Sequence, residues 1–455
     1  MKLMHRRHFL RAAACVVPAM ALAACGAALT APVATPVLTA PTAAPASTQP
    51  PTRQQATGRV TFMAWGSPQA IVQRKQFFED FNKAHSGANC DFILTPSNYM
   101  DKLLTMVAGG DAPDVFFVNP GDAPTLANKQ ILQPLDPHIQ QGKFDVDDFI
   151  PAAIKQYIVG GKTYALPRGF GMSAIFYHVE LFKKAGVEPV PTDWKETNWT
   201  FPTFVAAARK LTSGSGGAKQ FGYIIDTSNT RQWMTYVWSN GGEVFTSDYK
   251  QCLLDQAPAV DALQLLQDLI VKDGAAPTTA AMQDTGVMQM FDTGRVAMSI
   301  SEPFTFAQRR KEAKFTWDVG IVPAGKRGRL PGAGGVGWGM YDKTKAPDLA
   351  WQVLSELAGK KFQTKEIQEG TTSPPRLSVL RSGAFQDASQ LPAHASVFLD
   401  ESNYVRTDPQ PPNSAEVNAA MQKQMDYLWT GERNAQTVAK AVVDAVTPLL
   451  TKPAG

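Results

Sequence analysis

The sequence predicts an α/β protein divided into at least two lobes. Its 455 residues exceed the size at which a single hydrophobic core stops growing. Runs of strand composition alternate along the chain with stretches whose apolar residues have helical spacing, as in proteins that pack helices on sheets. With 44% hydrophobic and 18% charged residues, the composition is that of a globular protein, not of a disordered, collagenous or multi-span membrane chain.

The first expected elements form a βαβαβ series. Residues 59–65 (RVTFMAW) have strand composition, and residues 72–85 follow with helical spacing of apolar positions. A second strand over 90–95, an amphipathic helix over 99–108 and a short apolar strand over 114–118 complete the series. This order predicts a parallel sheet with right-handed crossovers.

A parallel sheet places its ligand crevice beyond the carboxyl ends of its strands. Two loops lie at those ends, Trp65-Gly66-Ser67 and Asn119-Pro120-Gly121. We therefore expect both loops to border a binding site.

The rest of the chain continues the mixed pattern. Further strands are expected over 161–168, 174–178 and 292–300. Further helices are expected over 179–186, 199–211, 259–272, 415–429 and 434–450. Residues 332–339 hold five glycines and a tryptophan.

The first 25 residues have the features of an export signal. A basic start is followed by an apolar run over 12–23, which is too short to span a bilayer comfortably, and then by small residues and a cysteine. The segment Leu22-Ala23-Ala24-Cys25-Gly26 resembles the lipobox of bacterial lipoproteins, which implies lipidation at Cys25. The alternative is a plain secretory signal with an incidental cysteine. The Arg6-Arg7 pair resembles a twin-arginine signal, and the choice between that route and the general secretory route stays open.

Residues 26–57 predict a tether. They consist mainly of Ala, Thr and Pro and carry one charge, Arg53, so they cannot bury a core. Repeated prolines favour extended conformations, and we expect a semi-stiff stalk that holds the folded body away from the membrane.

Charge and cysteine content limit the possible partners. Four basic residues and no acidic one lie in the first 25, and without them the chain has 40 basic and 40 acidic residues. A neutral chain gives no electrostatic reason to expect nucleic acid as a partner. Beyond the signal only Cys90 and Cys252 remain. A bridge between them would lock a hinge if they lie in different lobes, so we expect two free, buried thiols.

Several short phrases occur in the order that is found in one protein family. These phrases are APDV at 112–115, QPLD at 133–136, GKTYALP at 161–167, LFKKAGV at 181–187, FDTGRVAMSISEPF at 291–304 and APDLAW at 346–351. Each phrase is weak alone, but their shared order extends over most of the chain beyond the tether. The chain resembles the extracellular solute-binding proteins of ABC importers, in the carbohydrate-binding branch that is similar to maltose-binding protein.

The resemblance implies a two-lobed periplasmic-binding-protein fold of type II. Its two discontinuous α/β lobes would be joined by a hinge and separated by a central cleft. Lobe one would hold residues 58–167 with 328–375, and lobe two residues 168–327 with 376–455. A ligand that contacts both lobes stabilises the closed form.

The same resemblance implies a function and its partners. The protein would be a monomer on the outer face of the membrane, held by its lipid anchor, with no cofactor. It would capture an oligosaccharide or related polyol and deliver it to the permease subunits of an ABC transporter. A sugar phosphate or glycerol phosphate is an alternative ligand, because binders of glycerol phosphate share the fold.

A sugar cleft needs planar hydrogen-bonding groups beside flat aromatic rings. In lobe one and at the first crossing, the candidates are Trp65, Ser67, Asn119, Arg168 and Phe170. Three of them have structural alternatives: Trp65 could belong to the core, Asn119 could merely start a turn, and Arg168 could pair with a carboxylate.

In the rest of the chain, the candidates are Gln232, Trp233, Glu302, Phe304, Trp338 and Arg376, with Tyr404 as a further suggestion. Trp233 corresponds to a segment that supplies an aromatic platform in the maltose-type proteins. Phe304 stands where the family frequently has tryptophan, and Trp338 follows the glycine-rich loop. Glu302 could accept bonds from sugar hydroxyls or form a salt bridge in the cleft wall.

The sequence gives little support for catalysis. A glycosidase needs two carboxylates across a scissile bond, and Glu302 has no evident partner in the sequence. Nucleophile-elbow, zinc-protease and P-loop sequences are lacking, and the histidines beyond the signal are scattered without metal-ligand spacing. We expect a binding protein, with an anchored glycan hydrolase as the alternative.

Overall fold

The computed structural model describes residues 57–452 apart from residues 96, 284 and 412. The export signal with Cys25 and nearly all of the tether lie outside the described residues.

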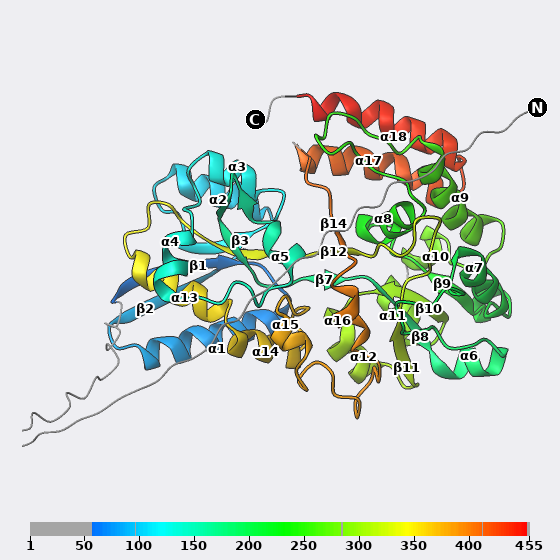
Figure 1. The fold of residues 1–455 in the computed structure, drawn as a ribbon, viewed down its shortest axis with the longest axis horizontal. Coiled ribbons are helices and arrows are strands. Elements are labelled where there is room, and N and C mark those ends of the chain that lie inside the picture. Colours follow the sequence, from blue (N-terminus) through cyan, green and yellow to red (C-terminus); the bar gives the residue numbers. More distant parts are fainter. Residues whose placement is uncertain (1–56, 96, 284, 412, 453–455) are drawn as a thin grey trace, which may run out of the picture. The chain divides into compact units, whose positions relative to one another are not determined.

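A five-stranded sheet forms the centre of the first lobe (Figure 1). In spatial order its strands are β2 (Ala88–Leu94), β1 (Gly58–Ala64), β3 (Val115–Val118), β13 (Gly337–Met340) and β6 (Ala165–Pro167). β1 pairs in parallel with β2 and β3, so the order predicted from the βαβαβ series is confirmed for these three strands. The sheet as a whole is mixed, because β13 runs antiparallel to both β3 and β6. Beyond the three strands of the βαβαβ series, the sheet is extended by β13 and β6, which that series does not include.

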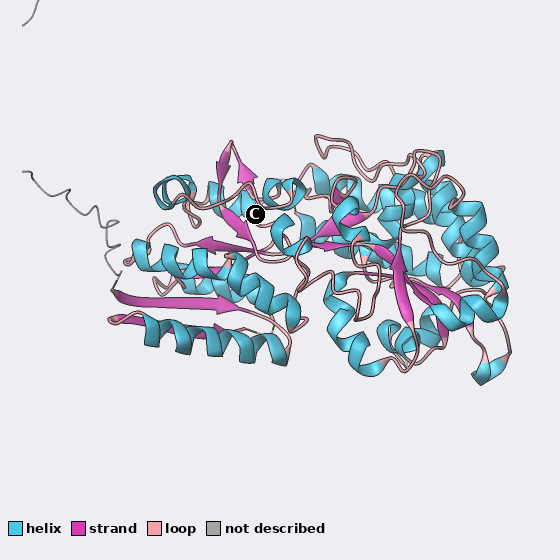
Figure 2. Ribbon diagram, turned by 60° about the horizontal axis from the view of Figure 1, so that its bottom comes forward, coloured by secondary structure: helices cyan, strands magenta, loops and turns pink. Residues whose placement is uncertain are grey.

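Helices cover both faces of this sheet (Figure 2). In chain order they are α1 (Pro68–Ala84), α2 (Tyr99–Ala108), α3 (Ala123–Asn128), α4 (Asp136–Gly142), α5 (Pro151–Lys155), α13 (Pro347–Leu357) and α14 (Lys360–Gln368). The short strands β4 (Ile158–Val159) and β5 (Lys162–Thr163) form a separate hairpin. The lobe has two hydrophobic cores. The larger one packs Phe62 and Phe78 against Trp338, and the smaller one includes Phe116.

A four-stranded sheet forms the centre of the second lobe. Its order is β11 (Trp317–Gly320), β8 (Ala174–His178), β10 (Val296–Ser301) and β9 (Phe221–Ile224). All four strands are buried along their whole length, because helices pack over the sheet.

The helices of the second lobe come from the middle and the end of the chain. They are α6 (Val179–Ala185), α7 (Phe201–Lys210), η1 (Gly216–Ala218), α8 (Thr230–Ser239), α9 (Ala257–Val271), α10 (Thr279–Gln283), α11 (Val287–Asp292), η2 (Pro303–Thr305), α12 (Phe306–Glu312), α15 (Leu377–Leu380), α16 (Val397–Glu401), α17 (Ser414–Trp429) and α18 (Ala435–Leu450). α17 and α18 pack against each other and against α9, so residues far apart in sequence share one core.

A small three-stranded sheet stands between the two larger ones. It consists of β14 (Arg406–Thr407), β12 (Gly332–Gly334) and β7 (Gly171–Met172). The crossing segments approach so closely that a Cβ on Gly335 would lie 1.8 Å from the carbonyl oxygen of Gly169. A glycine is therefore needed at position 335, where the second crossing between the lobes passes the first crossing at Gly169.

Both predicted free thiols are confirmed: Cys90 and Cys252 are buried and unpaired. Burial raises the pKa of Cys90 to about 12 and that of Cys252 to about 11, so neither is a reactive thiolate at neutral pH. Among the described residues, we find no helix with the length and apolar content that crossing a bilayer requires.

Candidate functional site

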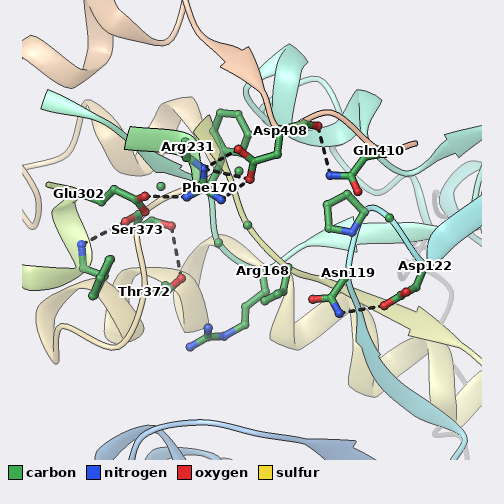
Figure 3. Close-up of a pocket in the computed structure, with 18 of the residues that line it drawn as sticks. Asn119, Asp122, Arg168, Phe170, Arg231, Glu302, Thr372, Ser373, Asp408 and Gln410 are labelled. Carbon is green, nitrogen blue, oxygen red and sulfur yellow. Dashed lines mark hydrogen bonds and ion pairs between the residues drawn. The ribbon is translucent and has the colours of Figure 1, made fainter. Parts of the chain in front are cut away.

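A cleft of about 660 Å³ lies between the lobes (Figure 3). From the first lobe and the crossings it is lined by Trp65, residues 119–122, 168–171, 334–336 and 371–373. From the second lobe and the segment after β14 it is lined chiefly by Arg231, Glu302, Phe304, Asp408 and Gln410. Trp65 directly follows β1 and Asn119 directly follows β3, so the cleft lies beyond the carboxyl ends of these parallel strands, as expected for such a sheet.

Arg231 is the centre of a charged cluster on the lobe-two wall. It lies in the first turn of α8. Its Nη1 donates to Oε1 of Glu302 at 2.6 Å, and its Nη2 donates to Oδ2 of Asp408 at 2.6 Å. Its Nε lies 3.1 Å from each oxygen of Asp408. One guanidinium therefore holds two carboxylates (Figure 3).

The electrostatics of this cluster keep Arg231 charged. Burial by itself lowers the pKa of Arg231, but Asp408 and Glu302 outweigh it and hold the pKa above its ordinary value. Charge-assisted bonds of this kind are roughly twice as strong as neutral ones. The positive charge of Arg231 is therefore paired within the protein and is not available to a ligand.

Glu302 reaches Arg231 past a glycine. A Cβ on Gly171 would lie 1.7 Å from Oε2 of Glu302, so a larger residue at position 171 would displace the carboxylate. Glu302 thus forms the salt bridge in the cleft wall that was one of its two alternatives, while it still lines the cleft.

Arg168 is also paired. Its Nε and Nη2 donate to Oε1 of Glu366 at 3.0 and 2.7 Å, and Nη2 also donates to the carbonyl of Thr371 at 2.9 Å. Glu366 is completely buried. The carboxylate-pairing alternative therefore describes Arg168. Its side chain ties the first crossing to residues 366–371, and its backbone N–H donates to the carbonyl of Val336 at 2.9 Å.

A third arginine, Arg74, holds the backbone of the cleft residue Trp65. Arg74, fully buried in α1, donates from Nη1 to the carbonyl of Trp65 at 2.6 Å and stands 4.9 Å from the ring centre of Phe117. Burial, with a contribution from the charge of Arg168, lowers the pKa of Arg74 to about 9, although Glu366 opposes that change. Arg74 thus fixes the backbone that presents Trp65 to the cleft.

Two aromatic rings from opposite sides border the cleft. Phe304 lines the cleft, and 44% of its surface is exposed to solvent. Its backbone N–H donates to Oγ of Ser373 at 3.1 Å, which holds the main chain at Phe304 next to the cleft segment 371–373. Trp65 packs edge-on against Tyr99 and Phe117, with ring centres 4.6 and 4.7 Å away, and remains partly exposed.

The loop after β3 contributes polar groups. Nδ2 of Asn119 donates to Oδ2 of Asp122 at 2.9 Å, and the carbonyl of Asn119 accepts from the N–H of Asp122 at 3.0 Å. Burial raises the pKa of Asp122, and the bond from Asn119 offsets part of that rise. Asn119 therefore starts the turn and also lines the cleft, so its two alternatives occur together.

Five predicted site residues do not line the cleft. Ser67 caps α1, where its Oγ accepts from the N–H of Ala70 at 3.2 Å. Trp233 is completely buried in α8 and belongs to the lobe-two core. Gln232, also buried, accepts from the N–H of Asp226 at 2.8 Å. Because the helix turns these two side chains away from the cleft, the platform expected at Trp233 is absent from this wall.

Trp338 and Arg376 are the other two. The ring of Trp338 stacks on Phe117 at 4.4 Å and is fully buried within the first sheet. Arg376 is buried, and its guanidinium donates to the carboxylate of Asp148 and to the carbonyl of Ala358. Both residues serve packing, since β13 turns Trp338 into the core. Phe170 borders the cleft with a buried side chain, and Tyr404 stacks on Trp194 away from it.

The sequence analysis missed the charged cluster. Arg231 stands directly before the two residues that were chosen, and a clear signal for Asp408 was lacking. Arg231 lies in the first turn of a buried helix, where the helix dipole disfavours a cation. This position could have indicated that a carboxylate neutralises the charge of Arg231.

Comparison with known proteins shows the family of this chain. The model of the bacterial extracellular solute-binding protein family matches residues 67–364. The chain belongs to this family. Maltodextrin-binding protein MdxE of Bacillus subtilis (strain 168) is 24% identical over 344 residues, which cover 74% of this chain and 77% of that protein.

Two further comparisons extend the family assignment. The sn-glycerol-3-phosphate-binding periplasmic protein UgpB of Salmonella typhimurium is 21% identical over 422 residues, 88% of this chain and 94% of that protein. The structure of an ABC substrate-binding protein from Listeria monocytogenes in complex with cycloalternan superposes with a TM-score of 0.75, at 22% identity, over 86% of this chain and 98% of that one. The family member described here thus has the two-lobed type II fold predicted from its sequence.

Proposed function

We propose that this family member is the lipid-anchored, extracellular binding component of an ABC importer, and that its cleft captures a neutral sugar, an oligosaccharide or related polyol, for delivery to the permease. The observation that carries the proposal is the exposed ring of Phe304 beside a polar wall in which two carboxylates hold the one arginine. Sugars offer hydroxyl edges and apolar C–H faces, and such a wall accommodates both.

The charge balance favours a neutral ligand over a sugar phosphate. Of the described residues that line the cleft, the basic ones are Arg168 and Arg231, and both are committed to carboxylates. Phosphate recognition requires available donors with positive charge. A phosphate ligand is the alternative, because UgpB, a relative, binds glycerol phosphate. The paired arginines of this cleft favour a neutral sugar.

The hydrolase alternative has less support. Glu302 and Asp408 both line the cleft, yet both are held by the same guanidinium. A glycosidase needs one carboxyl free to protonate the leaving oxygen and a second free to act on the sugar or on water. We therefore propose a binding protein without enzymatic activity.

Anchoring and assembly are further parts of the proposal. Cys25 would carry the lipid, the tether would span the distance from the membrane, and the folded body would act as a monomer without cofactor or nucleic acid. An intact-mass measurement of the native protein and of Cys25→Ser tests the anchor: a mass increment of acyl chains on Cys25 supports it, and an unmodified or fully cleaved chain contradicts it.

The central test is a ligand screen by thermal shift and calorimetry. The panel holds neutral di- to hexasaccharides, the corresponding sugar phosphates and glycerol phosphate. A true ligand at 100 times its Kd should stabilise the fold by about 2.7 kcal/mol. We expect stabilisation by one or more neutral sugars, which chromatography recovers intact. A response confined to phosphates contradicts the neutral-sugar proposal, and cleavage of the bound sugar would establish the hydrolase.

A further inference from the structure

A second cavity of about 490 Å³ adjoins the cleft at the β14 edge of the small sheet. Asp408 and Gln410 line both cavities, so the segment after β14 stands between them. One wall comes from α5, which packs on β6 of the first lobe, and the other from the loop that follows α8 in the second lobe. The second cavity is thus also an interlobe site.

Its charge balance differs from that of the cleft. Lys155 of α5 and Arg406 of β14 both line it. Nη1 of Arg406 donates to Oε1 of Glu243 at 2.8 Å, but Arg327 donates to the same oxygen, also at 2.8 Å. One carboxylate therefore balances two guanidinium groups. The other lining carboxylate, Asp408, is already held by Arg231.

Several donors in this cavity remain without a partner. Among the described residues, no ion pair involves Lys155, and Nε and Nη2 of Arg406 make no hydrogen bond. The hydroxyl of Tyr249 accepts from the N–H of Gln410 at 3.1 Å, which leaves its own hydrogen to donate. The guanidinium of Arg406 is held over the ring of Trp238 at 5.0 Å, so its free edge has a defined position.

We propose that this second cavity binds a small organic anion, a carboxylate or a phosphate ester, between Lys155 and Arg406. The ammonium of Lys155, which no ion pair of the described residues involves, and the free N–H groups of Arg406 favour such an ion, and the cavity volume exceeds what a simple inorganic ion needs. Since both lobes form the walls, anion binding is linked to the opening of the cleft. The anion site itself does not depend on the proposed sugar function, whereas the link to the cleft does.

The test is calorimetric titration of the purified protein with citrate, with phosphate and with glucose 6-phosphate at constant ionic strength. We expect saturable binding of at least one of these anions. Lys155→Met should weaken it at least tenfold, and Arg406→Gln should do the same. Lys162→Met is the matched control, because Lys162 is an exposed lysine of the neighbouring hairpin outside the cavity, and it should change affinity less than twofold.

The three anions identify the preferred group, carboxylate or phosphate. Absence of saturable binding, or equal loss in Lys155→Met and Lys162→Met, would overturn the site. The link to the cleft is measured by repeating the titration with saturating sugar: the anion and the sugar should alter each other's affinity by the same factor. Equal anion affinities with and without a sugar that binds would refute the link. Failure of every sugar to bind would overturn the proposed function, yet the anion titration would still decide the anion site.

Discussion

The guanidinium of Arg231 holds the carboxylate of Asp408 through two donors, with Nη2 at 2.6 Å and Nε at 3.1 Å. These residues are 177 positions apart in the sequence. The pair fastens the start of α8 to the segment that leaves the small sheet after β14. The shape of the lobe-two wall therefore depends on one partly buried ion pair.

Replacing Asp408 tests that dependence. Asp408→Asn leaves Arg231 with Glu302 alone, which changes the arrangement of the wall that faces the ligand. We expect at least a tenfold loss of sugar affinity by calorimetry, with a smaller change in melting temperature. Asp400→Asn, at an exposed position of α16, should leave affinity unchanged. Equal affinities of the Asp408 variant and the native protein would remove the cluster from the site.

Gly171→Ala tests the same cluster from the other side. Its methyl group would collide with the carboxylate of Glu302, so Glu302 must leave Arg231. We expect a tenfold or greater loss of sugar affinity. Gly217→Ala is the control, because its methyl would meet no atom within 4 Å. If crystals of the Gly171→Ala variant kept the Glu302–Arg231 bond, the steric argument would be wrong.

Phe304 should contribute to binding and little to stability. Aromatic contacts add about 0.5–1.5 kcal/mol beyond area burial, so Phe304→Ala should weaken sugar binding by up to about tenfold. Its ring is exposed, and the melting temperature should stay within a degree or two. Tyr404 is the matched control, since it is 47% exposed and stacks on Trp194 outside the cleft. A greater loss of affinity in Tyr404→Ala than in Phe304→Ala would contradict the placement of the ligand.

Glu366 should matter more for stability than Arg168. Glu366→Gln leaves two buried guanidinium groups, Arg168 and Arg74, without their shared carboxylate, and breaking a buried pair costs about 3–5 kcal/mol. Arg168→Met costs less, because Glu366 keeps Arg74 nearby. Chemical denaturation measures both. Arg59→Ala, at an exposed ion pair, should change stability by less than about 1 kcal/mol, and the reverse order of the two buried variants would refute the shared role of Glu366.

Glu401 predicts a stability that falls with rising pH. Burial, with the nearby charge of Glu302, raises the pKa of Glu401 well above its ordinary value. The folded protein then binds a proton that the unfolded chain has lost, so this contribution is full below the unfolded pKa and is lost as the pH rises through the folded pKa. The slope is at most about 1.4 kcal/mol per pH unit.

The variant Glu401→Gln removes this slope. Its stability relative to the native protein should therefore rise with pH across that window, as measured by denaturant titrations at several pH values. Glu79→Gln, at an exposed position of α1, should leave the pH profile unchanged. Parallel profiles of the native protein and the Glu401 variant would show that Glu401 does not stay protonated in the fold.

The local pattern of the sequence predicted most of the elements. The expected helix over 99–108 matches α2, and the expected strand over 174–178 matches β8. Both have strong periodic or apolar patterns over their whole length. The antiparallel entry of β13 into the first sheet was not predictable in this way, because its direction depends on the path of the chain through the second lobe.

Candidate site residues were predictable where they lie next to a strand end. Trp65, Asn119 and Phe304 follow strands or crossings that the sequence marks, and they line the cleft. The family resemblance implied an aromatic platform at Trp233 and a ligand contact at Trp338, but both side chains are fully buried. A large ring satisfies a core and a cleft equally well in sequence, and only its orientation on the folded element separates the two.

The sequence by itself determined the α/β class, the family and the positions of the main elements, because these depend on local periodicity, composition and short motifs. The tertiary structure decided which charges meet. Arg231 with Asp408, and Arg168 with Glu366, are brought together by crossings between the lobes. Ion pairs leave no periodic trace in the sequence, since the energy of each depends on distance and burial that only the folded chain supplies.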